Sequence, residues 1–390
     1  MTQYPIFRKN LVSSQAIDKY MLAFAAAAAT ATCSNPGFGT AAQLHLNVTR
    51  AAAIVAGDFD GDGFIDLASA NTVPNIAWMR NTDGKGTFGD VQVVSMLASG
   101  ASDLAKGDID GDGNLDLVSV SIYDHKVAWY PNSDGNGTFG DQQVVSQNQK
   151  YPSRVAVGDI DGDGDLDIAV SSYRDNRVVW FENTGGKGTF VQKDSFYLSQ
   201  VTSLQLGDVD GDGTLDIVGG KHQIDISHIT IWFNRKGSFS GRSISAASLA
   251  VSNLALGDID GDGKLDIAAL DLVSLAWYDT NVHPVTKHSV TRDPGNSPSD
   301  VLLADFDGDG ALDLTSSSAY KISWYKNTDS RGTFSSQINF GGLQEHVVSL
   351  AVADFDGNGW KDIAAASQSK DNPITFYPNT CGSAPSVGEE

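Results

Sequence analysis

The chain has 390 residues, of which 41% are hydrophobic and 41 are glycine. This apolar content supports a substantial core, and the many glycines are typical of a fold rich in tight turns. The formal net charge of −22 argues against nucleic-acid binding, because phosphate backbones attract a basic protein face.

Residues 1–31 predict a secretory signal peptide. Segment 20–31 reads YMLAFAAAAATA and follows three basic residues, and Ala29 and Ala31 occupy positions −3 and −1 of a cleavage site before Thr32. The alternatives are an N-terminal helix or a misassigned start codon. The apolar stretch is too short to span a bilayer and the chain holds no longer one, so we expect no membrane span. The segment predicts a secreted protein, extracellular or at the cell surface.

Residues 32–382 contain seven copies of one repeat. Each copy carries an acidic loop of the pattern D-x-D-G-D-G-x-x-D or a close variant, and successive loops lie 47 to 51 residues apart. The loops begin at Asp58, Asp108, Asp159, Asp208, Asp258, Asp305 and Asp354. A regular period of this length is typical of a solenoid, a propeller or an array.

Each copy also carries four short strand signals in a fixed order. A first apolar run precedes the acidic loop, as at 155–157, and a second follows it, as at 117–120. A third run contains an aromatic pair in most copies, as at 129–130, and a glycine-rich turn leads to a fourth, as at 143–145. Such runs between Gly, Asn and Asp clusters are typical of hairpin-linked strands. We predict an all-β fold, a seven-bladed β-propeller of four-stranded antiparallel blades.

The ends of the chain predict how the ring closes. The last copy stops after its third strand, at 374–377, whereas an unmatched Phe-Gly turn and a strand at 43–46 precede the first copy. An N-terminal strand is therefore expected to complete the last blade and leave no open edge. The predicted blades lie near residues 51–98, 101–147, 152–199, 201–248, 251–292, 299–341 and 347–378 plus 38–48, within a propeller spanning 32–382, and residues 383–390 form a C-terminal tail.

Two cysteines, Cys33 and Cys381, flank this predicted junction. A disulfide between them would lock the ring and stabilise it by roughly 5 kcal/mol if the chain-entropy model holds. It would also agree with export to an oxidising compartment. The alternative is a pair of unrelated thiols.

The acidic loops predict metal sites. Positions 1, 3, 5 and 9 carry Asp, positions 4 and 6 carry Gly, which permits positive φ, and position 7 can add a backbone carbonyl. Oxygen ligands without His or Cys favour Ca²⁺ over zinc or copper, and magnesium demands stricter geometry. The alternative is a set of solvated turns, in which four close carboxylates would repel one another without a cation. We expect up to seven Ca²⁺ ions.

The predicted ligands are Asp58, Asp60, Asp62, Phe64 and Asp66; Asp108, Asp110, Asp112, Asn114 and Asp116; Asp159, Asp161, Asp163, Asp165 and Asp167; Asp208, Asp210, Asp212, Thr214 and Asp216; Asp258, Asp260, Asp262, Lys264 and Asp266; Asp305, Asp307, Asp309, Ala311 and Asp313; and Asp354, Asp356, Asn358, Trp360 and Asp362. Positions 1, 3, 5 and 9 of these loops hold 27 of the 48 acidic residues, and seven Ca²⁺ ions would bring the net charge from −22 to −8. Asn358 replaces a carboxylate, so the seventh loop is expected to bind most weakly.

These loops, together with Phe-Gly pairs at 88–89 and 139–140, resemble the FG-GAP/VCBS repeat family, which includes the N-terminal propeller of integrin α subunits. The resemblance covers about residues 37–380. It implies calcium hairpins on one face of a propeller and partners on the opposite face. Because the family includes adhesion receptors, fungal lectins and polysaccharide lyases, function has to be argued from a site.

The opposite face would be built by the loops between second and third strands and by the links between blades. Exposed Tyr, Arg and His there are residue types that anchor ligands, although each alone is also an ordinary loop tip. The predicted ligand-binding residues are Tyr123, His125, Tyr151, Tyr173, Arg174, Arg177, His222 and His228. The third-strand tryptophans, by contrast, recur in six copies and are expected to pack between blades; Trp360, in the seventh loop, is the exception and is expected to be exposed.

We therefore expect calcium-dependent binding of an extracellular glycan or protein, as in adhesion or a lectin, with structural calcium and no assigned catalytic residue. One alternative is a polysaccharide lyase or another carbohydrate-active enzyme, which would use His222, Asp225 and His228 of the irregular fourth copy. Another is a structural surface protein that associates with copies of itself.

Overall fold

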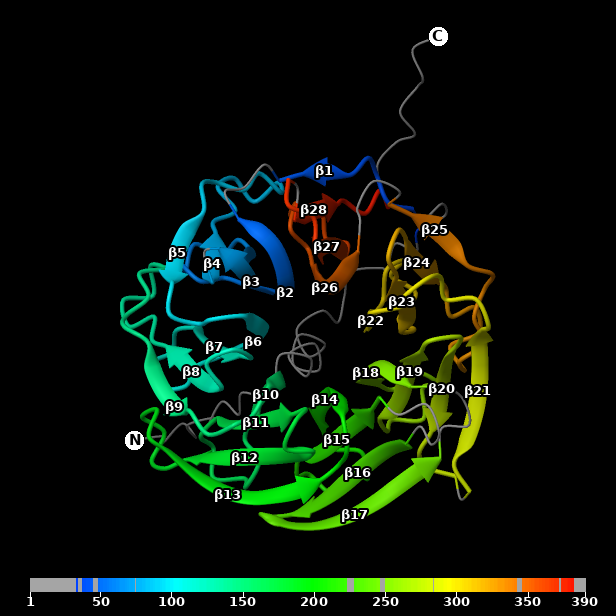
Figure 1. Cartoon of the computed structure of the whole chain (residues 1–390). Helices are drawn as coiled ribbons and strands as arrows, with labels where there is room; N and C mark the ends of the chain where they lie inside the picture. The colour runs from blue at the N-terminus through cyan, green and yellow to red at the C-terminus, as the bar shows by residue number, and fades with distance from the viewer. Residues whose placement is uncertain are drawn as a thin grey trace, which may run out of the picture.

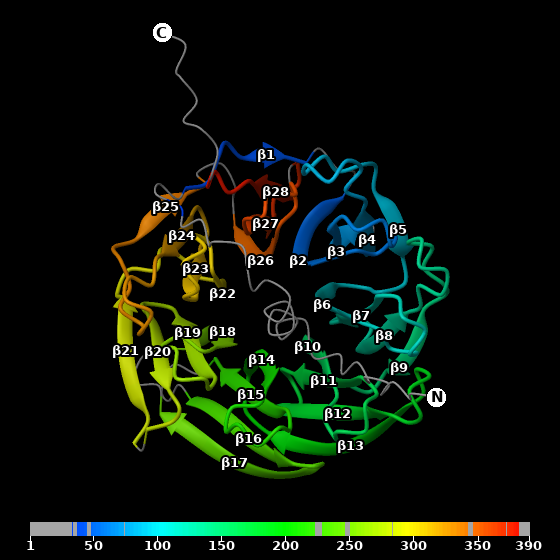
Figure 2. The ribbon, with the colours of Figure 1, turned by 180° about the vertical axis from the view of Figure 1, so that it is seen from behind.

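The computed structural model describes residues 33, 37–44, 48–73, 75–222, 228–245, 250–282, 284–341, 346–371 and 373–381. Within these ranges the chain forms seven antiparallel sheets of four strands each and no helix. Figures 1 and 2 show the sheets arranged as blades in a ring, with the first strand of each blade innermost, and we call the centre of this ring the channel. The predicted all-β, seven-bladed propeller is confirmed. None of the described residues belongs to a helix that would cross a membrane.

The strands of blades 1 to 4 are β2 (Thr49–Gly57), β3 (Asp66–Val73), β4 (Ile76–Met79) and β5 (Gln92–Ser95); β6 (Ala101–Gly107), β7 (Asp116–Ser121), β8 (Lys126–Tyr130) and β9 (Gln143–Ser146); β10 (Pro152–Gly158), β11 (Asp167–Ser172), β12 (Arg177–Asn183) and β13 (Phe190–Tyr197); and β14 (Val201–Gly207), β15 (Asp216–Lys221), β16 (His228–Arg235) and β17 (Ser238–Ser245). Those of blades 5 to 7 are β18 (Val251–Gly257), β19 (Asp266–Asp271), β20 (Leu275–Asp279) and β21 (Thr286–Thr291); β22 (Asp300–Ala304), β23 (Asp313–Ser317), β24 (Ile322–Tyr325) and β25 (Ile338–Phe340); and β26 (Val347–Ala353), β27 (Asp362–Ser367), β28 (Ile374–Tyr377) and β1 (Ala42–Gln43).

Each blade has a buried middle and a solvent-facing outer strand. All six residues of β7, β11, β19 and β27 are buried, whereas β13 is mostly exposed. Sheets covered on both faces need small, apolar or β-branched residues without alternation, which is the composition of these second strands. The outer strands face water on one side and carry polar residues. The sequence pattern therefore sets the order of the strands from the channel to the rim.

Neighbouring blades pack through the third-strand tryptophans. These six side chains are at most 6% exposed, as predicted for a packing role. A glycine in the turn of the next blade covers the rings of Trp78, Trp129 and Trp277 closely: Gly188 has φ 70°, and a Cβ added there would collide with the ring of Trp129. Glycine is needed at this position both for its backbone conformation and for the close approach. Trp360 is half-buried rather than exposed.

The N-terminal segment completes blade 7, as predicted. Strand β1 pairs antiparallel with β28, with Ala42 opposite Phe376, and Figure 1 shows β1 along the outer edge of that blade. Phe38 reaches into the junction with blade 6, where its ring stacks on that of Phe340 with centroids 4.1 Å apart. The strand is shorter than the 43–46 segment expected, and residues 45–47 lie outside the described residues, as do residues 1–32 with the predicted signal peptide.

A disulfide joins Cys33 to Cys381, whose Cα atoms lie 5.3 Å apart. The backbone N–H of Cys33 donates to the carbonyl of Asp307 in the acidic loop of blade 6, at 3.0 Å. The N–H of Cys381 donates to the side chain of Asn379 in blade 7. The covalent link therefore ties both ends of the described chain to the junction between blades 6 and 7.

Candidate functional site

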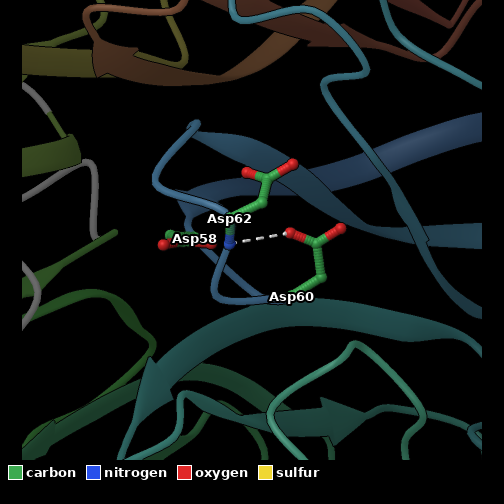
Figure 3. Close-up of side chains that lie close together, drawn as sticks. All are labelled: Asp58, Asp60 and Asp62. Carbon is green, nitrogen blue, oxygen red and sulfur yellow. Dashed lines mark hydrogen bonds between the residues drawn. The ribbon is translucent and has the colours of Figure 1, made fainter.

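All seven acidic loops have the same internal hydrogen bonds. The carboxylate at position 1 accepts the N–H of the glycine at position 6, at 2.8 to 3.0 Å. The side chain at position 5 accepts the N–H of position 7, also at 2.8 to 3.0 Å. In blade 1 the glycines at positions 4 and 6 have φ values of 72° and 90°, which curl the backbone around its own carboxylates. Figure 3 shows the result for Asp58, Asp60 and Asp62.

The carboxylates of a loop converge on one point. Ligand oxygens from three Asp lie within 4.8 Å of one another in seven such groups. The groups of the first five blades are Asp58, Asp60 and Asp62; Asp108, Asp110 and Asp116; Asp159, Asp161 and Asp167; Asp208, Asp210 and Asp216; and Asp258, Asp260 and Asp262. Like charges at this separation repel, so the arrangement is one that a bound cation stabilises.

The ninth-position Asp is buried beneath each loop. In blade 2 the two oxygens of Asp116 accept the N–H groups of Ile109 and Asn132, at 2.9 and 2.7 Å. Burial, with a smaller contribution from the charges of Asp110 and Asp112, raises the pKa of Asp116 to about 7, against the lowering by these backbone hydrogen bonds. A nearby divalent cation would favour the ionised form of such a group.

Buried carboxylate oxygens that lack a hydrogen-bond partner also fit a bound cation. Among the described residues, Asp110, Asp210 and Asp307, all at position 3, each have a buried carboxylate oxygen without a hydrogen-bond partner. A buried acceptor without a donor is costly unless an ion or water meets it. Hard oxygen donors in this number fit Ca²⁺. Carboxylates from positions 1, 3, 5 and 9 would hold the ion, which would supply charge neutralisation and a cross-link within the loop.

A recurring asparagine attaches six of the seven acidic loops to the next blade. The Nδ2 of Asn132, just after β8, donates to the carbonyl of Phe59 in the acidic loop of blade 1, at 2.7 Å. The same bond is made by Asn81, Asn132, Asn183, Asn234, Asn327 and Asn379. Blade 5 carries Thr280 instead, which bonds Leu265 of its own blade. Sequence analysis did not identify these residues, although Asn recurs three residues after Trp in four copies.

Four of the predicted ligand residues come together at the opposite end of blades 2 and 3. The guanidinium carbon of Arg174 lies 4.8 Å from the ring centroid of Tyr151, and the ring of Tyr173 lies 6.3 Å from that of Tyr151. His125 Nδ1 accepts the N–H of Tyr151 at 3.3 Å. Tyr151 has φ 59°, a left-handed backbone conformation that recurs at the equivalent position of other blades. We call these four residues the Tyr151 cluster.

The other predicted ligand residues lie outside this cluster. Tyr123 is 71% exposed and packs beside Gly100, and Arg177 begins β12, opposite Tyr197. The N–H of His222 donates to the carbonyl of Gln200 in blade 4. His228 begins β16, but its side chain lies outside the described residues, as does the whole of 223–227 with Asp225.

The Tyr151 cluster adjoins a cavity of about 360 Å³ at the mouth of the channel. First-strand residues of six blades line it, and Tyr173 and Arg154 contribute side chains. Burial raises the pKa of Asp300 in this channel to about 6, whereas the charge of Arg154 lowers it. Asp300 also accepts the N–H of Leu350 in the next blade at 2.7 Å. Arg154 was not identified from the sequence; it is the one basic residue at its repeat position.

Comparison with known proteins agrees with these features. Residues 58–119, 108–170, 161–219 and 305–365 each match the FG-GAP-like repeat, which together is more than half of the chain. The chain belongs to the FG-GAP-like repeat family. No curated protein matches this FG-GAP-like chain in sequence.

Two solved structures share the FG-GAP-like propeller's fold at low identity. An Agrocybe aegerita lectin, described as specifically recognising non-reducing terminal N-acetylglucosamine, is 18% identical, with a TM-score of 0.56 over 86% of this chain and 87% of its own. BBS1N, solved in complex with ARL6DN in a mercury-soaked crystal, is 11% identical, with a TM-score of 0.61 over 91% of this chain and 98% of its own. At these identities, both structures show that the fold is similar and nothing more.

Proposed function

We propose that this FG-GAP-like propeller is a secreted, calcium-stabilised binding protein that recognises an extracellular glycan through the face opposite its acidic loops. The observation that carries the proposal is the Tyr151 cluster beside the channel cavity. Aromatic rings and an Arg guanidinium at a concave, partly apolar surface are the groups that anchor ligands. The lectin propeller of similar fold supports a sugar as the ligand class.

The cluster supplies complementary contacts for a sugar. The ring of Tyr151 or Tyr173 would cover the apolar face of a pyranose, while the Arg174 guanidinium would donate to hydroxyl or carboxylate oxygens. Arg174 is already held over the Tyr151 ring, so less side-chain freedom is lost on binding. His125 orients the Tyr151 backbone through its hydrogen bond.

Calcium would act at a distance from the ligand. The acidic loops lie at the other end of each blade, because the metal loop joins first to second strands and the Tyr151 cluster lies on second-to-third turns and a link between blades. The ions would therefore hold the blades in register instead of contacting the sugar. Secretion is supported by the N-terminal sequence 1–31 and by the Cys33–Cys381 disulfide, which is typical of an oxidising compartment.

A glycan array probed with the chain in calcium and again in EDTA tests the proposal. The variant Tyr151→Gly removes the ring without backbone strain, because glycine tolerates φ 59° and Gly100 has φ 69° at the equivalent position of blade 2. It should fold normally and lose at least tenfold in affinity for any sugar that the wild type binds. The matched control, Ser297→Gly, makes the same exchange at φ 50° in blade 6 and should bind as the wild type does.

Other outcomes point to the alternatives. Binding that survives Tyr151→Gly would place the site elsewhere on the propeller. An array without hits for folded protein would reject the glycan and direct the search to a protein partner or to self-association, which analytical ultracentrifugation measures. Release of unsaturated sugars from a bound polymer would indicate a lyase.

A further inference from the structure

The acidic loops differ in one neighbouring side chain, at the end of the third strand. This position, which we call the slot, lies next to the loop-bonding Asn or Thr and faces loop positions 3 and 5. In blade 1 the slot is Arg80, whose Nε and Nη2 lie 2.6 Å from Asp60 and 2.8 Å from Asp62. The basic side chain therefore sits against the carboxylates that would hold the ion.

Two further blades repeat this arrangement. Arg235 in blade 4 follows Asn234, whereas the other slot residues precede their Asn or Thr, and it lies 2.7 Å from both Asp210 and Asp212. Lys326 in blade 6 pairs with Asp307 and lies 3.0 Å from Asp309. Different residue types, Arg and Lys, thus make the same contact in different blades.

The slot is acidic in blades 3 and 5. In blade 3 the slot is Glu182, and the N–H of the next residue, Asn183, donates to Asp167 of the acidic loop at 2.8 Å. In blade 5 the slot is Asp279, which accepts the N–H of Asn281 at 2.9 Å, and the side chain of Asn281 donates to Asp262 of the acidic loop at 2.9 Å. Lys193 pairs with Glu182 and offsets part of its charge.

The remaining slots, Pro131 in blade 2 and Pro378 in blade 7, are uncharged. The seven slots therefore hold three cations, two anions and two neutral residues, and the blade 2 loop also accepts a hydrogen bond from Lys187 of blade 3 at the backbone carbonyl of Asp110, not at a carboxylate. A resident cation repels Ca²⁺ and competes for the same oxygens, whereas an anion attracts it.

We propose that the slot residue divides the loops into two calcium affinity classes. The loops of blades 2, 3, 5 and 7 bind Ca²⁺ tightly. Those of blades 1, 4 and 6 bind it weakly, because Arg80, Arg235 and Lys326 serve as built-in cations that neutralise the carboxylates when calcium is scarce. The inference rests on the proposed function, because it requires that the acidic loops bind calcium. It ranks blade 7, despite Asn358, above the three blades with basic slots.

The size of the effect follows from the exposure of these pairs. The side chains of Arg80 and Arg235 are 47% and 56% exposed, so water screens much of their charge. Exposed ion pairs contribute little, but a divalent ion doubles the electrostatic term. We expect about a tenfold difference in dissociation constant between the classes.

Calcium titration of the chelator-treated full chain, followed by native mass spectrometry, counts the bound ions directly. The proposal predicts two overlapping phases, four Ca²⁺ first and three more at about tenfold higher free Ca²⁺. We call the ion count of the first phase the first plateau. Uptake of seven ions with a single affinity would overturn the two classes while leaving calcium binding intact. Uptake of no ions by folded protein would overturn the calcium part of the proposed function itself.

Slot variants assign the classes to particular blades. Arg80→Gln should raise the first plateau from four ions to five, and Arg235→Gln should do the same independently if the first variant folds poorly. Asp279→Asn should leave it at four, because blades 2 and 7 already bind tightly with neutral slots, and its amide oxygen can still accept the N–H of Asn281 that Asp279 now accepts. The control Arg292→Gln removes an exposed arginine from the link between blades 5 and 6, on the opposite face, and should leave the plateaus unchanged. Equal titrations for Arg80→Gln, Arg235→Gln and the control would refute the role of the slot.

Discussion

Replacement of Asn183 by alanine tests how far the propeller depends on the asparagines that join neighbouring blades. The side chain is fully buried, and its Nδ2 donates to the carbonyls of Ile109 and Leu166 at 2.7 and 3.1 Å. Its Oδ1 accepts the N–H of Gly188 at 3.0 Å. Alanine leaves the two carbonyls and the one N–H without the hydrogen bonds that the Asn183 side chain makes to them. Each orphaned buried group costs about 1 to 3 kcal/mol, and partial relaxation makes about 3 to 5 kcal/mol the expected total.

Urea unfolding in excess calcium measures this loss as a lower transition midpoint with an unchanged slope. The matched control is Thr280→Ala in blade 5, where one hydrogen bond of 2.8 Å to Leu265 is lost. It should cost about 1 kcal/mol. A loss below about 1 kcal/mol for Asn183→Ala, or one equal to the control, would refute the reasoning, because the bonds between blades would then contribute nothing beyond an ordinary hydrogen bond.

Three further predictions concern the junction, the channel and the packing between blades. Cys33→Ser should lower the unfolding free energy by about 5 kcal/mol relative to the wild type under oxidising conditions, and should match the wild type in reductant. Equal stability of the two proteins under oxidising conditions would contradict a stabilising disulfide. Burial raises the pKa of Asp300 to about 6, so its protonated form stabilises the fold at low pH and that stability is lost as the pH rises through 6. Arg154→Gln removes the charge that lowers this pKa, so the variant should lose more stability relative to the wild type at pH 7.5 than at pH 4, as measured by its unfolding midpoint. A loss that does not depend on pH would contradict the account. Gly188→Ala should destabilise by at least about 2 kcal/mol in the same assay, because its Cβ meets the Trp129 ring and its φ is 70°; a neutral effect would contradict the close approach.

Much of the fold follows from the sequence because the repeat carries local signals. The acidic loops mark the start of each second strand, and the aromatic pairs mark the third strands. The absence of a fourth strand signal after 374–377 indicates that the N-terminus completes the ring. These features are short-range patterns repeated seven times. Repetition turns a weak local signal into a strong one.

Side-chain contacts between blades, and across the hairpins within a blade, could not be predicted in the same way. Asn132 bonds Phe59, 73 residues away, and Arg80 meets a loop that it follows by 18 residues across a hairpin. Such contacts depend on how strands twist and how neighbouring blades pack, which no local pattern specifies. The sequence also did not specify which of the predicted ligand-binding residues would lie together. Tyr151 and Arg174 are in contact, whereas Tyr123 is exposed beside Gly100.

Thermal unfolding with and without calcium tests the central claim most directly. Each loop occupied at 100 times its dissociation constant contributes about 2.7 kcal/mol, so chelation of even four ions should lower the melting temperature by more than about 10 °C. The account predicts this drop in EDTA, with recovery on adding excess Ca²⁺ and much less recovery on adding Mg²⁺. A melting temperature that is the same in calcium and in EDTA would contradict it.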